Sequence, residues 1–153
     1  MGLAAELACK EIESLQEHLF ELKKLFAEGL SELPDVTIHL VDNKDGTELQ
    51  KEEREERLKK TAPHIMSVGF GGVRSEVLLH ALEEKGIYVS SGSACSSNHP
   101  AVSGTLKAID VKKELLDATV RFSFCKDTTK EELMYTLEVL KELLPQLRRF
   151  WRK

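Results

Sequence analysis

The sequence has few of the residues that mark disulfide-stabilised, metal-binding or membrane proteins. Its three cysteines, Cys9, Cys95 and Cys125, are odd in number and follow no repeated spacing, which argues against a disulfide framework and favours a reducing compartment. The chain contains no Cys-x-x-Cys pair, so no zinc site is predicted. No apolar run approaches the roughly 20 residues of a membrane span. The opening stretch MGLAAELACKEIE becomes acidic too early for a secretory signal. We therefore expect a cytoplasmic protein that does not bind membranes.

The charge pattern excludes a second class of function. The formal net charge is −4, with acidic and basic residues mixed along 153 residues, so the basic surface of a nucleic-acid-binding protein is lacking. The glycines Gly69, Gly71 and Gly72 are not followed by the Gly-Lys-Ser/Thr of a phosphate-binding loop, and we interpret them as a turn. The length and the 41% hydrophobic content are typical of one soluble domain with its own core.

Hydrophobic spacing predicts a mixed helix and strand protein. Apolar residues at three- and four-residue steps predict a long helix over 5–33, which Pro34 ends. Further helices are predicted at 75–85 with Gly86 as its cap, at 102–109, and at 129–149, which begins in a capping box at Thr128 or Thr129 and meets a kink or a restarted turn at Pro145. The predicted strands are 36–40, 65–70, 87–90 and 120–125. This order predicts an α/β domain in which helices cover a mainly antiparallel sheet of three or four strands.

A strongly charged segment interrupts this order. Residues 44–60 carry 12 charged side chains among 17 residues, a composition that we expect to be unable to bury a face. We interpret the segment as a solvated insertion, part helix and part loop. A docking surface for a partner is the alternative.

The segment SSGSACSSNHP, residues 90–100, is the first candidate for chemistry. Its first seven residues are all small, which predicts an open and mobile loop around Cys95. A thiol among small polar neighbours is accessible, and its thiolate is a nucleophile. His99 lies four residues later, but without a helical register we interpret it as a surface histidine rather than a catalytic partner. We interpret Cys9 and Cys125 as structural.

Arg121 is the second candidate. In the strand pattern VRFSF it alternates with Val120 and Phe122, so it shares the opposite face with Ser123. An arginine in such a strand is either an edge residue whose charged end reaches water or a planar fork for a carboxylate. Its position alone does not choose between these interpretations.

Four motifs in the same order give the sequence a family resemblance. SSGSACSS, TLKAI, VRFSF and TTKEEL resemble the C-terminal region of cysteine desulfurases of the NifS/IscS type, which are class V aminotransferases. The likeness covers 2–42 and 61–149 and leaves the charged insertion outside. It implies the small α+β domain of the fold-type I transferases that depend on pyridoxal phosphate. Residues 1–34 would be the long interdomain helix, and 35–153 the C-terminal domain.

The resemblance also implies a reaction. Such enzymes use pyridoxal phosphate to remove sulfur from L-cysteine, release L-alanine and leave a persulfide for acceptor proteins, as in iron–sulfur cluster biogenesis or tRNA thiolation. Cys95 falls on the family's persulfide cysteine, and Arg121 falls on the arginine that holds the substrate α-carboxylate. Family members are homodimers, mainly through their large domain.

One departure from the family pattern limits what this chain is expected to do alone. The family's Schiff-base lysine sits in a Ser/Thr-x-His-Lys motif of the large domain, and none of the five histidines here precedes a lysine. We therefore expect no tight binding of pyridoxal phosphate and no desulfurase activity without that domain. The alternatives are a stand-alone persulfide relay or partner-binding module, and half of an ordinary class V transaminase, against which SGSAC argues.

Overall fold

The strands of this chain form one antiparallel sheet in the order β1-β2-β4-β3. The structure, a computed structural model, describes residues 2, 3, 6, 9, 11–43, 45–91 and 103–151, the last two without their side chains. The strands are β1 (Val36–Ile38), β2 (Ile65–Phe70), β3 (Ser90–Ser91) and β4 (Thr119–Ser123). The helices are α2 (Ile12–Ser31), α3 (Lys51–Lys59), α4 (Ser75–Glu83), α5 (Gly104–Ala108) and α6 (Lys130–Trp151), with a short 3-10 turn, η1 (Lys113–Leu115). The predicted α/β fold class is confirmed.

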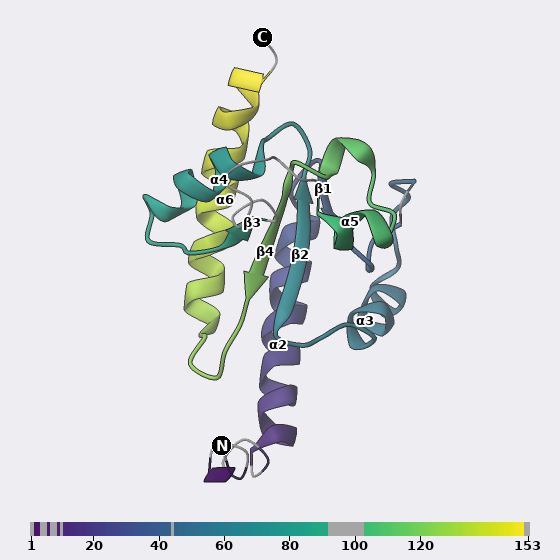
Figure 1. Ribbon diagram of the computed structural model, residues 1–153, viewed down its shortest axis with the longest axis vertical. Coiled ribbons are helices and arrows are strands. Elements are labelled where there is room, and N and C mark those ends of the chain that lie inside the picture. Colours follow the sequence, from purple (N-terminus) through teal and green to yellow (C-terminus); the bar gives the residue numbers. More distant parts are fainter. Residues whose placement is uncertain are drawn as a thin grey trace.

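One face of the sheet carries the main core. Alternate residues of β2 and β4 turn their side chains to this face, and α2 and α6 lie side by side behind it (Figure 1). Phe26 of α2 packs edge-on against Phe122 and Phe124, with ring centroids 5.0 and 5.9 Å apart. Leu78 and Leu82 of α4 complete the same core. The described helices include none with the length and apolarity needed to cross a membrane.

The predicted start of α6 at Thr129 and the predicted cap of α4 at Gly86 are confirmed. Thr129 and Glu132 make the capping box of α6, in which Glu132 N–H donates to Thr129 Oγ1 at 3.2 Å and Thr129 N–H donates to Glu132 Oε2 at 2.9 Å. Gly86 has a φ of +77° after α4, where its N–H and that of Ile87 bond back to Glu83 and Leu82. Pro145 does not end α6, which is continuous from Lys130 to Trp151.

Several element boundaries differ from those predicted. Residues 2, 3, 6 and 9 are helical, but the chain bends at Glu11 and α2 begins only at Ile12. Its apolar stripe is buried from Leu19 onward, while Ile12 is 47% exposed because the first turns of α2 extend past the sheet (Figure 1). The strand predicted at 87–90 forms at Ser90–Ser91 instead. Ile87 and Val89 pack against the core without pairing.

The prediction that the charged insertion cannot bury a face is wrong. Its second half is α3, and Leu58 of this helix is only 2% exposed. Two charged side chains that precede that leucine in α3 pair with α2, in the ion pairs Lys24–Glu55 and Lys51–Glu28, each 2.8 Å long. The hydrogen bond from Lys24 lowers the pKa of Glu55. The insertion is therefore fastened to α2 through one apolar anchor and paired charges.

Candidate functional site

The face of the sheet away from the main core holds Arg121. Thr119, Arg121 and Ser123 of β4 share this face, while Val120 and Phe122 enter the core, as the alternation predicts. Leu106 of α5 and Leu115 of η1 are buried over one end of the face, which leaves Thr119 only 5% exposed. Arg121 and Ser123 lie beyond this cover and are exposed. The guanidinium of Arg121 is thus open to a ligand.

Arg121 lies between two serines of the neighbouring strands. Its register partners are Ser67 of β2 and Ser90 of β3. Arg121 Nη2 donates a hydrogen bond to Ser90 Oγ at 3.4 Å. Among the described residues, no carboxylate pairs with Arg121. Because a guanidinium carries several N–H donors in one plane, this leaves a fork that fits a carboxylate.

The remaining residues singled out from the sequence divide into two groups. Cys95 and His99, and the loop 91–100 predicted to be mobile, fall at or beyond the end of β3, where only Ser91 of that loop is described. Cys9 and Cys125, which we interpreted as structural, are described, and both are exposed. Cys125 lies just past β4, in the turn that Thr128 closes by accepting from Cys125 N–H at 2.9 Å. Any thiol reagent therefore has access to at least two competing cysteines.

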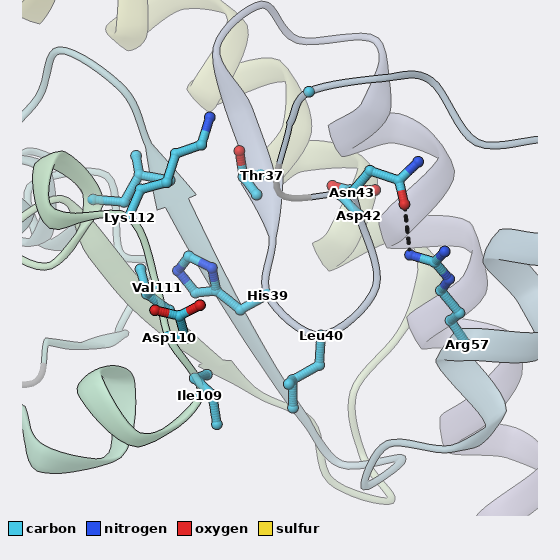
Figure 2. Close-up of a pocket in the computed structure, with 12 residues that line it drawn as sticks. Thr37, His39, Leu40, Asp42, Asn43, Arg57, Ile109, Asp110, Val111 and Lys112 are labelled. Carbon is cyan, nitrogen blue, oxygen red and sulfur yellow. Dashed lines mark hydrogen bonds between the residues drawn. The ribbon is translucent and has the colours of Figure 1, made fainter.

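A groove that contains His39 was not predicted from the sequence. It has a volume of about 360 Å³ and lies between the turn after β1, the insertion and the segment from Ile109 to Lys112 (Figure 2). Arg57 closes one side by donating to Asn43 Oδ1 at 2.9 Å (Figure 2). Leu40 and Asp110 on its wall have φ angles of 67° and 58°, a left-handed conformation that costs energy in residues other than glycine.

His39 lines this groove, and a hydrogen bond to Thr119 fixes its ring. Thr119 Oγ1 donates to Leu115 O at 2.6 Å, so it accepts from His39 Nε2, 2.9 Å away. Burial lowers the pKa of His39 to about 4, so the ring is neutral at pH 7 and a weak base. Gly69 makes room for the ring, because a Cβ there would lie 3.1 Å from His39 Cε1. Gly69 lies within β2, as the predicted strand 65–70 requires, so only Gly71 and Gly72 of the three glycines belong to the turn.

The described residues do not fit the lysine anchor that pyridoxal phosphate needs. Lys23 is the one buried lysine among them, and burial lowers its pKa to about 8. Its Nζ donates to Thr61 Oγ1 at 2.6 Å and to Ala62 O at 2.7 Å. An imine at Lys23 would break both bonds. The described part of the chain also contains no cluster of side chains suited to a metal ion.

Comparison with known proteins places the chain in a family. The model of the family described as aminotransferase class-V matches residues 1–135. The cysteine desulfurase IscS of Buchnera aphidicola subsp. Baizongia pistaciae is 33% identical over 148 residues, and that of Dictyoglomus turgidum is 36% identical over 148 residues. Each alignment covers 97% of this chain and 32% or 34% of the relative. The chain thus spans about a third of the length of these relatives.

Solved structures agree with this result. A NifS-like protein superposes with a TM-score of 0.70 and 26% identity over 93% of this chain and 31% of its own. The apo cysteine desulfurase of Thermococcus onnurineus NA1 superposes with a TM-score of 0.60 and 26% identity over 87% of this chain and 26% of its own. The NifS-like protein of Rickettsia africae, at 19% identity and a TM-score of 0.69, shares the fold. From its sequence and its fold, this chain belongs to the class V aminotransferase family.

Proposed function

We propose that this chain is the sulfur-accepting C-terminal part of a cysteine desulfurase that converts L-cysteine to L-alanine and leaves a persulfide on Cys95. The observation that carries the proposal is the exposed guanidinium of Arg121, which pairs with no described carboxylate and lies beside β3, the strand that precedes Cys95 in the sequence. Cys95 is four positions after Ser91 in the sequence, and four Cα–Cα steps of an extended chain span at most about 14 Å. We propose that the carboxylate fork on β4 and the thiol that follows the neighbouring strand β3 in the sequence act on one substrate.

Arg121 would bind the α-carboxylate of the substrate. A guanidinium forms two parallel hydrogen bonds with a carboxylate, which fix the orientation of the amino acid as well as its position. Arg121 stands on a strand paired on both sides, so its backbone is held by β2 and β3. Orientation is what the reaction needs, because the bond to be broken must face its electron acceptor.

Cys95 would accept the sulfur as a thiolate. Its sulfur forms the new S–S bond with the sulfur of the substrate, while the bond between that sulfur and the substrate carbon breaks. The electron pair of the broken bond stays with the carbon skeleton, which takes up a proton and leaves as alanine. This step needs an electron acceptor, and the described residues offer none. In the family that acceptor is pyridoxal phosphate.

We further propose a division of the chain into two parts. Residues 1–34 would form the helix that joins the two domains, and 35–153 the small domain. The exposed Ile12 on turns of α2 that pass beyond the sheet supports a further partner surface there, for which a large domain is our proposal. Substrate cysteine, sulfur-acceptor proteins and a homodimer would belong to the complete protein.

Replacement of Arg121 tests the proposal. The chain is co-expressed with the large domain of a related desulfurase, and alanine release is measured against the concentration of L-cysteine. Arg121→Lys keeps the charge but loses the planar fork, so we expect kcat/KM to fall about 10- to 100-fold, which corresponds to the loss of one or two charge-assisted hydrogen bonds. Ser123→Ala, on the same exposed face, is the matched control and should stay within about twofold. Equal activity of the two variants would refute the role of Arg121.

A further inference from the structure

The two serines beside Arg121 differ in what they do. Ser67 and Ser90 are its register partners on either side, so all three residues share one face of the sheet. Only Ser90 bonds to it, by accepting from Arg121 Nη2 at 3.4 Å. This is the one side-chain hydrogen bond that Arg121 makes among the described residues.

We propose that Ser90 is a positioning residue, which orders the guanidinium of Arg121 for carboxylate binding. An exposed arginine loses side-chain conformational entropy when it is held in one rotamer. A hydrogen bond made before the ligand arrives reduces the part of this cost that falls on binding. The inference rests on the proposed function, since the carboxylate would be that of the substrate cysteine.

The hydrogen bond to Ser90 leaves enough N–H groups of Arg121 free to bind a carboxylate. The bond to Ser90 occupies one of the two hydrogens of Nη2, so Nε, Nη1 and the second hydrogen of Nη2 remain available. A carboxylate can therefore still bind to Arg121 in a bidentate manner. Ser90 does not compete with the ligand but restricts the plane in which the fork lies.

Ser90 is itself anchored well enough to hold Arg121. The backbone of β3 pairs with β4 at Ser90 and Ser91, next to Arg121 and Val120 respectively. Just before β3, the side chains of Ile87 and Val89 pack against the core. The position of Ser90 is thus set by the sheet and the core, so a ligand at Arg121 need not order it.

The first test uses this chain alone and does not depend on activity. Nuclear magnetic resonance reports the order of the Arg121 side chain through the heteronuclear NOE of its Nε–H group, which is assigned by its loss in Arg121→Lys. We expect Ser90→Ala to lower this value clearly, while Ser90→Thr, which keeps a hydroxyl, preserves it. Ser67→Ala is the matched control from the other flanking strand and should leave it unchanged. Equal values for Ser90→Ala and Ser67→Ala would overturn the proposal.

The second test uses the complex with a large domain. The loss of a hydrogen bond worth about 0.5–1.5 kcal/mol should raise KM for L-cysteine about 2- to 10-fold in Ser90→Ala, with kcat within about twofold. Ser67→Ala and Ser90→Thr should match the unmodified protein, and all variants should melt at the same temperature. A fall in kcat with KM unchanged would contradict the positioning role. A complex without any alanine release would instead refute the proposed function, and the order of Arg121 would still decide the role of Ser90.

Discussion

Arg121 is exposed because β4 alternates between the core and a face that is covered at one end only. The sequence predicts this much, since Val120 and Phe122 on either side are apolar. It does not predict that no described carboxylate pairs with Arg121, because that depends on strands distant in the sequence. The same holds for His39, whose burial depends on Gly69 of the next strand and on Leu115 of η1. The alternation of apolar residues shows which face of a strand a side chain occupies, but only the folded structure shows which residues of other strands lie next to it.

His39 makes a prediction about acid stability. Burial lowers its pKa from 6.5 to about 4, so the folded state resists a proton that the unfolded state accepts. The stabilising contribution is complete above pH 6.5 and is lost as the pH falls toward 4, by about 1–3 kcal/mol. Urea unfolding at several pH values should show this loss. It should be smaller in His39→Gln, and unchanged in His64→Gln, a control at an exposed histidine. An identical pH dependence in all three proteins would contradict the assignment.

At the scale of elements, agreement with the sequence follows the strength of the local signal. β2 occupies the predicted residues 65–70, where an apolar run is bounded by a turn. Thr129 and Gly86 mark the start of α6 and the end of α4 because their signals act within a few residues. The predicted position of β3 was wrong because Ile87 and Val89 have the apolar pattern of a strand but pack against the core without pairing to another strand. The prediction that the charged insertion cannot bury a face was wrong because composition gives the number of charges but not their ion-pair partners on α2.

Leu58 tests the account of the insertion. If α3 is fastened to α2 through this buried side chain, Leu58→Ala should lower the free energy of unfolding by about 2–4 kcal/mol. Glu56→Ala, on the exposed side of the same helix, is the control and should change it by less than about 0.5 kcal/mol. Chemical denaturation measures both. A freely solvated insertion would instead give two equally small changes.

At the scale of the whole molecule, the proposed reaction also needs an anchor for the cofactor, and no described lysine is placed to serve as one. We therefore expect this chain alone to release no alanine from L-cysteine above the rate of free pyridoxal phosphate. The large domain supplied in trans should raise that rate. Alanine assay and the absorbance of a pyridoxal imine measure both. Activity of the isolated chain, together with such an absorbance, would mean that a lysine of this chain serves as the anchor.

The most direct test of the central claim is to find where the sulfur goes. The complex with a large domain is allowed to turn over L-cysteine, quenched with an alkylating reagent and digested, and the cysteine peptides are weighed by mass spectrometry. The exposed thiols of Cys9 and Cys125 act as internal controls, since access alone would label them as well. The account predicts the mass of one additional sulfur atom on the peptide of Cys95 and its loss in Cys95→Ala. Additional sulfur on Cys125 but not on Cys95 would contradict it.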